Sequence, residues 1–79
     1  MQQLPPLGTA LQQARKKRFP ADDQRSFALR LGVSRATLQK MEQGDLSVSL
    51  KSYYDAANLL DTQADFAALF TLKGSLFDD

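Results

Sequence analysis

The side chains that could do chemistry are gathered on one face of a predicted helix between residues 35 and 43. Leu38 and Met41 stand three positions apart, so they fall on the same, buried side of that helix. We interpret the opposite side as a surface that touches a partner, because most of its side chains donate hydrogen bonds. Its members are Arg35, Ala36, Gln39, Lys40 and Gln43.

The composition offers few of the side chains that enzymes commonly use for catalysis. The chain has no Cys and no His, which removes disulfides, thiol nucleophiles, the usual zinc ligands and histidine bases. The remaining carboxylates and hydroxyls are scattered, and we can place no pair of nucleophile and base among them. We therefore expect a protein that is not an enzyme and that carries no cofactor and no metal.

Two short helices joined by a sharp turn must position the polar face. Phe27, Ala28 and Leu31 share one side of the first helix. Gly32 follows it, at a place where the backbone often turns left-handed and where Gly does so without steric cost. Ser34 can cap the second helix by accepting a backbone N–H two or three residues on. The pattern predicts a helix, a turn and a second helix that ends near residue 44.

Five residues of this stretch hold fixed places relative to one another: Gln24 first, Ala28 fifth, Gly32 ninth, Leu38 fifteenth and Met41 eighteenth. This spacing resembles the helix-turn-helix of the Cro/repressor-like (XRE) family of DNA-binding proteins. Two helices that cross at roughly 90–120° need a small side chain where they approach and a Gly where the chain reverses. The resemblance implies an all-α, five-helix, lambda-repressor-like DNA-binding domain. The alternative is another all-helical domain in which Gly32 is merely a cap.

The resemblance also implies that the second helix of the motif lies in the major groove of DNA, with Arg35, Ala36, Gln39 and Lys40 facing the bases. Their chemistry agrees with that role. Arg35 can present two donors to guanine, and Gln39 can pair with adenine. Lys40 can donate to guanine or to phosphate, and Ala36 can pack on a thymine methyl. The alternative is an ordinary exposed polar face.

Other polar side chains are better suited to phosphate contacts, which fix register without reading sequence. These are Gln24, Ser34, Thr37, Gln43 and Lys17. Gln24 gains further support because a helix N-terminus favours anions. Lys17 belongs to a basic run over residues 15–18 that would equally suit the negative end of a helix dipole. A structural role and a phosphate contact therefore remain open for this run.

The charge distribution is two-sided, although the 79-residue chain has a net charge of only +1. Up to residue 40, eight Lys and Arg stand against two Asp, which gives +6. From residue 41 onward, two Lys stand against seven Asp and Glu, which gives −5. A basic half can meet phosphates while an acidic half turns away from them. The alternative is that these charges only solvate the surface.

Helix-capping and helix-breaking residues divide the chain into a predicted flexible arm over residues 1–6 and one domain over residues 7–79. We expect further helices over residues 7–18, 50–60 and 64–72, the second of them capped by Ser49. Asp23, or Asp22, should cap the first helix of the motif. Asp61 stands where a left-handed residue often ends a helix.

No stretch stays apolar for the roughly 18 residues that a bilayer span requires. The chain also lacks the basic and apolar regions of a signal peptide at its start. We therefore expect a cytoplasmic protein that has no membrane partner.

The C-terminal segment, about residues 62–79, is more apolar than one edge of a small domain readily hides. Its large apolar members are Phe66, Leu69, Phe70, Leu72, Leu76 and Phe77. We expect them to pair two copies into a symmetric homodimer, with reading helices about 34–36 Å apart on DNA. The alternative is that they complete the core of a monomer.

Three functions follow from these expectations. The first is a transcriptional repressor that binds double-stranded DNA as a homodimer on an inverted repeat. The second is a DNA-binding antitoxin whose apolar tail also binds a toxin. The third is a protein-interaction module that does not touch DNA. Arg35 and Lys40 argue against the third, because a protein contact would favour aromatic or aliphatic anchors on that face.

Overall fold

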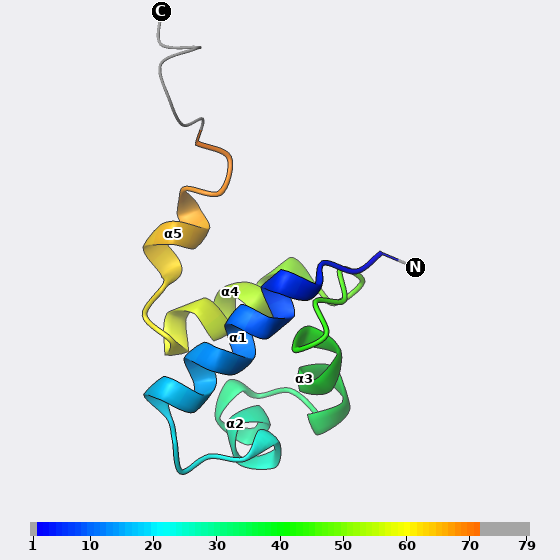
Figure 1. Cartoon of the computed structure of the whole chain (residues 1–79), viewed down its shortest axis with the longest axis vertical. Coiled ribbons are helices and arrows are strands. Elements are labelled where there is room, and N and C mark those ends of the chain that lie inside the picture. Colours follow the sequence, from blue (N-terminus) through cyan, green and yellow to red (C-terminus); the bar gives the residue numbers. More distant parts are fainter. Residues whose placement is uncertain (1, 72–79) are drawn as a thin grey trace, which may run out of the picture.

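Five helices fold into a bundle with one helix standing at its edge (Figure 1). The computed structural model describes residues 2–71, and this part of the chain contains no β-strand. The predicted all-α, five-helix class is thus confirmed. The helices are α1 (Pro5–Arg18), α2 (Gln24–Leu31), α3 (Arg35–Met41), α4 (Leu50–Leu59) and α5 (Gln63–Ala67).

Side-chain caps begin three of these helices where they were predicted. Asp23 accepts a hydrogen bond from the backbone N–H three residues on, at 2.8 Å, and so caps α2. Ser34 caps α3 in the same way at 3.0 Å, and Ser49 caps α4 at 3.1 Å. Each cap satisfies one of the backbone donors that a helix N-terminus leaves without a partner.

Left-handed residues end two helices, again as predicted. Gly32 closes α2 with a φ of 83°, and its N–H donates to the carbonyl of Ala28. Asp61 follows α4 with a φ of 62°, a conformation that Asp tolerates better than most residues. These two reversals turn the chain from α2 into α3 and from α4 toward α5.

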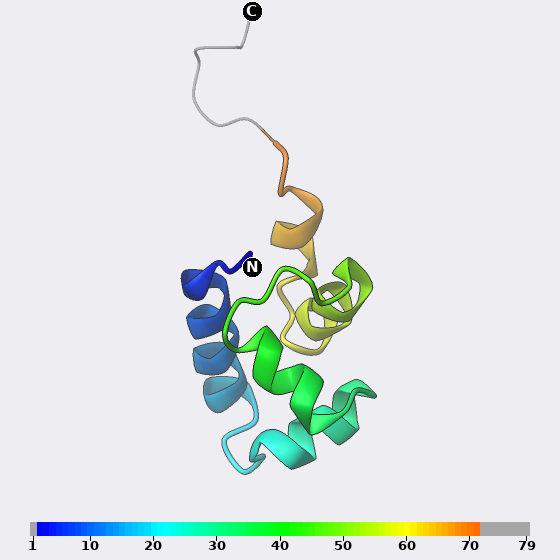
Figure 2. The same ribbon diagram turned by 90° about the vertical axis from the view of Figure 1, so that its right-hand side faces the viewer.

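One core holds the bundle together, and the motif supplies its centre. Phe27, Leu38 and Met41 are fully buried, so α2 and α3 pack against each other and against the rest of the core. Burying a side chain of this size contributes about 1.5–3 kcal/mol. Leu11 from α1 and Tyr53 from α4 close the core on the other side. Figure 2 shows α3 lying across the bundle between α1 and α4.

The N-terminal segment differs from the predicted arm. The first helix begins at Pro5, two residues earlier than expected, because Pro is tolerated in the first turn, where a backbone N–H has no partner in any case. The N–H of Leu4 donates to the carbonyl of Gly44 at 2.8 Å. The N–H of Leu46 donates to the carbonyl of Gln2 at 3.1 Å. Residues 2–4 are therefore bonded to the turn after α3.

The last two helices are shorter than predicted. Helix α4 ends at Leu59 instead of residue 60, and α5 ends at Ala67 instead of residue 72. Beyond α5 the chain continues in tighter turns, in which Leu69 and Thr71 donate to carbonyls three residues back. A helix this short gains stability mainly from packing, and α5 has no fully buried residue. No helix within residues 2–71 combines the length and the apolar character that a bilayer crossing needs.

Candidate nucleic-acid interface

The outward face of α3 is open to solvent. Arg35, Ala36, Gln39 and Lys40 are all exposed, whereas the opposite side of the helix is buried in the core. Figure 2 shows α3, in green, on the face turned toward the viewer, where no other helix covers it. The four predicted base-reading residues therefore share one accessible surface, which has the hydrogen-bond donors needed to contact base edges.

The turn between α2 and α3 fixes the angle of this surface. Ala28 is almost fully buried, and its carbonyl accepts from the N–H groups of both Gly32 and Val33. A larger side chain at residue 28 would push the two helices apart. Beyond the turn, the Ser34 hydroxyl donates to the Thr37 hydroxyl at 3.0 Å while it caps α3. These two predicted phosphate-contacting residues thus also hold the first turn of the exposed helix.

A buried polar network ties this unit to α1. Arg15 donates from Nε to Glu42 Oε2 at 2.6 Å and from Nη2 to Glu42 Oε1 at 3.3 Å. Its Nη1 donates to the carbonyl of Asp22 at 3.1 Å. Gln24 Nε2 donates to the same Glu42 carboxylate at 2.9 Å. The network orients Gln24, whose amide nitrogen carries a second hydrogen for another acceptor.

The basic residues in the last turn of α1 have different surroundings and therefore different roles. Arg15 is buried and fully engaged in the network, so its role is structural. Lys16, Lys17 and Arg18 are exposed at the end of the same helix. Lys17 therefore stays available for the predicted phosphate contact. Gln43, which lies two residues beyond the end of α3, is also exposed.

A polar hollow of about 170 Å³ opens between the N-terminal ends of α2 and α3. It is lined by Asp23, Gln24, Arg25 and Arg35. Hydrogen bonds from Ser26 lower the pKa of the Asp23 carboxyl, and the positive charges of the two arginines add to the effect. The hollow thus carries two guanidinium groups against one carboxylate, and the guanidinium groups can bind an anion such as a DNA phosphate.

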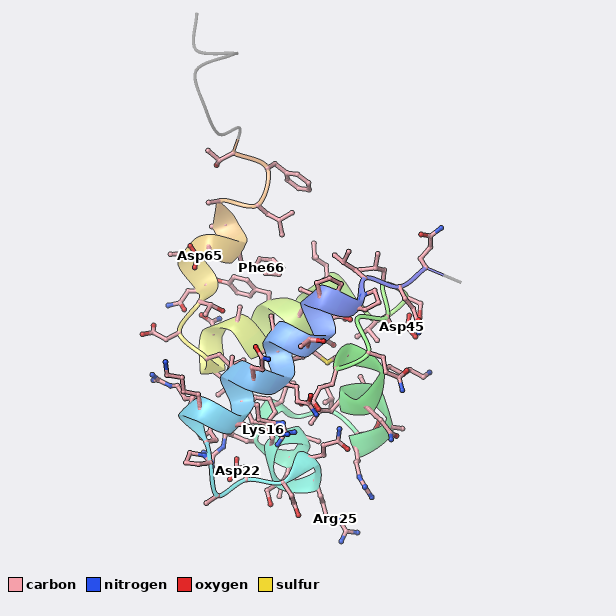
Figure 3. All side chains as sticks on the ribbon, viewed as in Figure 1. Lys16, Asp22, Arg25, Asp45, Asp65 and Phe66 are labelled. Carbon is pink, nitrogen blue, oxygen red and sulfur yellow. The ribbon has the colours of Figure 1, made fainter. Side chains whose placement is uncertain are left out.

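Arg25 was not among the predicted contacts, although it directly follows Gln24 in the sequence. Figure 3 shows its side chain extending away from the body of the protein. Its position next to Gln24 at the start of a helix was the only signal that could have indicated this role. Glu42 was also missed, because its partner Arg15 lies 27 positions away.

The predicted dimer residues fall into three groups. Phe66, which is labelled in Figure 3, packs at the edge of the core. Its ring centroid lies 5.4 Å from that of Tyr54. Phe66 thus contacts the core of its own chain, and its role in a dimer interface stays a prediction. Leu69 and Phe70 are 56% and 89% exposed. Leu72, Leu76 and Phe77 lie outside the described residues.

Residues 2–71 contain no group of three or more Asp, Glu, His or Cys side chains that could hold a metal ion. The exposed polar side chains of α2 and α3 carry positive charge, amide or hydroxyl groups instead. The arrangement can therefore bind an anionic, acceptor-rich partner by hydrogen bonds and charge.

Comparison with known families agrees with this geometry. Residues 23–67, more than half of the chain, match the family described as Helix-turn-helix. The matched range begins at the Asp23 cap and includes α2, α3, α4 and α5. Searches among curated proteins and among solved structures gave no match. The chain belongs to the helix-turn-helix family, as a Cro/repressor-like DNA-binding protein.

Proposed function

We propose that this protein is a transcriptional repressor that binds an inverted-repeat operator as a homodimer. The observation that carries the proposal is the exposed face of α3, which presents Arg35, Gln39 and Lys40, with Arg25 of α2 beside Arg35. A surface of this kind suits the major groove, which offers base acceptors flanked by phosphates.

The two kinds of contact have separate roles in this proposal. Arg35 and Gln39 read bases, and Ala36 and Lys40 complete the reading face. Gln24, Ser34, Thr37, Gln43 and Lys17 position the domain on phosphates, and Arg25 joins them. Because phosphate contacts release counterions, binding should weaken steeply as salt rises.

Dimerisation multiplies the specificity of one reading helix. The exposed apolar side chains of Leu69 and Phe70 support a second copy as partner, because they are adjacent in the chain and a contiguous exposed apolar surface marks an interaction site. Two copies related by a twofold axis would read half-sites one helical turn apart, about 34–36 Å. A dimer bound over a promoter would exclude the polymerase, which makes the protein a repressor.

Selection of bound duplexes from a random pool tests this function. We expect enrichment of an inverted repeat whose half-sites lie about 10–10.5 base pairs apart, centre to centre. A pool that shows no enrichment after several rounds would contradict sequence-specific binding. Enrichment of a single half-site would retain DNA reading but remove the dimer.

A second candidate function is an antitoxin, and the exposure of Phe70 also favours it. In that case the apolar C-terminal surface would bind a toxin while α3 binds DNA. The measurement is co-expression with the product of a neighbouring toxin-like gene. Protection from its toxicity that depends on Phe70 would favour the antitoxin over a simple repressor.

A further inference from the structure

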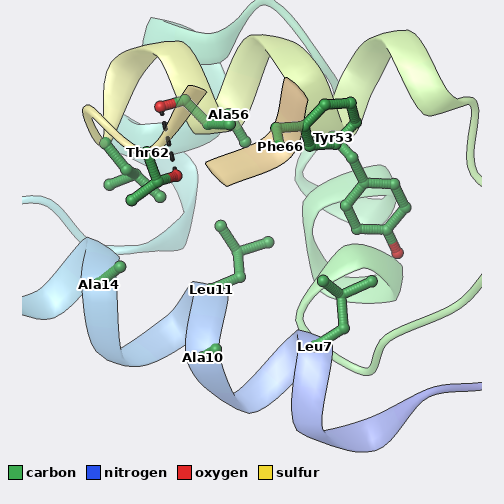
Figure 4. A pocket seen from close by; sticks show the side chains of 10 residues that line it. Leu7, Ala10, Leu11, Ala14, Tyr53, Ala56, Thr62 and Phe66 are labelled. Carbon is green, nitrogen blue, oxygen red and sulfur yellow. Dashed lines mark hydrogen bonds between the residues drawn. The ribbon is translucent and has the colours of Figure 1, made fainter. Parts of the chain in front are cut away.

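An apolar groove of about 260 Å³ runs between α1, α4 and the start of α5 (Figure 4). Small side chains, Ala10 and Ala14 from α1 and Ala56 from α4, form much of its lining. Leu7 and Phe66 also line it. Because alanines leave space that larger side chains would fill, the groove can accept an aromatic or branched side chain from outside.

The segment that follows α5 carries side chains of that kind. Leu69 is 56% exposed and Phe70 is 89% exposed, so the described fold gives them little cover. Hydrogen-bonded turns join Leu69 to Phe66 and Thr71 to Ala68. Figures 1 and 2 show residues 68–71, in orange, continuing away from the bundle. This part of the segment therefore points away from the groove of its own chain.

We propose that two copies exchange these segments, so that Leu69 and Phe70 of each copy occupy the α1/α4/α5 groove of the other. The inference rests on the homodimer of the proposed function and names the surfaces that form it. A reciprocal exchange closes after two copies, because each contributes one groove and one apolar segment.

Insertion of Leu69 and Phe70 would contribute apolar area to such a dimer from both partners. A buried Phe removes about 150–250 Å² from water, and each partner would contribute both an inserted segment and a groove. A standard interface needs about 800 Å² per partner. The sequence after Thr71 contains three more large apolar residues, Leu72, Leu76 and Phe77.

Charge also favours the α1 side of the groove as the receiving surface. After Thr71, the sequence carries Asp78 and Asp79 against one Lys, Lys73. Arg18 lies four positions beyond Ala14 and so continues the same face of α1, and it is exposed. An acidic segment laid along this face would meet a positive charge at the end of the helix.

The role of Phe70 as a side chain inserted into the groove of the other copy is tested by comparing Phe70→Ser with Leu29→Ser in the full chain. Leu29 is 82% exposed on α2, so neither substitution removes a buried side chain. We expect Phe70→Ser to raise the dimer dissociation constant about 100-fold or more in sedimentation equilibrium, since two insertions are lost per dimer. Leu29→Ser should leave the constant unchanged. Equal behaviour of the two variants would overturn the inference.

The receiving side is tested by Ala10→Glu, which places a charge in the groove, with Thr9→Glu as its control. Both residues are exposed on α1, but only Ala10 lines the groove. Ala10→Glu should weaken the dimer by a similar factor, and Thr9→Glu should not. Circular dichroism of both variants shows whether the fold is retained.

Mixing the Phe70→Ser chain with the Ala10→Glu chain tests whether the two substitutions disrupt the same contact between copies. A Phe70→Ser chain keeps an intact groove, and an Ala10→Glu chain keeps an intact Phe70. Only their heterodimer has one intact contact, so a labelled mixture should associate at least about tenfold more tightly than either variant alone. No gain on mixing, or a wild-type chain that stays monomeric, would overturn the exchange. Sequence selection from a duplex pool would still succeed in that case, which separates this failure from failure of DNA reading.

Discussion

Arg15 and Glu42 form an ion pair of 2.6 Å between α1 and the residue that follows α3, and their side chains are only 6% and 4% exposed. Glu42 shares its carboxylate with Gln24 at the start of α2. One carboxylate thus joins three helices, and it sets where the exposed face of α3 lies relative to a predicted phosphate contact.

Removing one partner of this pair should strongly destabilise the fold. We expect Glu42→Ala to lower the free energy of unfolding by about 3–5 kcal/mol, because it leaves the Arg15 guanidinium buried without its carboxylate. Urea titration followed by circular dichroism measures this loss. The double variant Arg15→Met with Glu42→Leu should be more stable than Glu42→Ala, since apolar side chains can replace a buried pair. A single variant that loses less than about 1 kcal/mol would show that the pair is not stabilising.

The glycine after α3 should tolerate substitution far less than the glycine after α2. Gly44 has a φ of 76°, and a Cβ there would collide with the carbonyl group of Leu4. Gly32 has a φ of 83°, but a Cβ there meets nothing within 4 Å. We expect Gly32→Ala to cost about 1–2 kcal/mol from backbone strain alone. Gly44→Ala should cost more, because the N-terminal segment must also move; thermal unfolding of the two variants gives the order.

Acid should destabilise the protein through two aspartates. Hydrogen bonds from Ser26 hold the pKa of Asp23 below its ordinary value of 3.8, and hydrogen bonds from Ser47 do the same for Asp45. Because the folded pKa lies below the unfolded one, this stabilisation is present above pH 3.8 and disappears as the pH falls below it. The double variant Asp23→Asn, Asp45→Asn should therefore lose less thermal stability than the wild type on acidification. Equal losses would show that these carboxyls do not cause the effect.

Local signals in the sequence predicted much of the motif. The caps at Ser34 and Ser49 and the left-handed Gly32 and Asp61 depend on a few neighbouring residues and were predicted correctly, and of the two candidates for the cap of α2, Asp23 and Asp22, the structure has Asp23. The exposure of the α3 face followed from its helical spacing.

Features that depend on distant residues were missed. The pairing of Arg15 with Glu42 joins residues 27 positions apart, and the groove combines three helices. The apolar spacing after Ala64 predicted a helix to residue 72, but the described fold offers little surface to stabilise its last turns, and α5 ends at Ala67. Base reading by α3 remains a prediction.

Two arginines at the polar hollow should behave differently on DNA. We expect Arg35→Ala to weaken binding to the selected operator by about 1–3 kcal/mol and to relax preference at one base pair. Arg25→Ala should weaken all duplexes about equally and reduce the slope of log affinity against log salt by about one. Fluorescence anisotropy with operator and single-substitution duplexes separates the two effects. If Arg35→Ala leaves base preference unchanged, Arg35 does not read a base.

The most direct measurement of DNA reading by α3 is a competition titration with the wild-type chain. The selected operator and a scrambled duplex of the same composition compete for binding over a series of salt concentrations. We predict that affinity for both falls as salt rises and that the operator is preferred by about 10³-fold or more. Equal affinity for the two duplexes, or binding that does not respond to salt, would contradict a role for α3 in recognising base pairs.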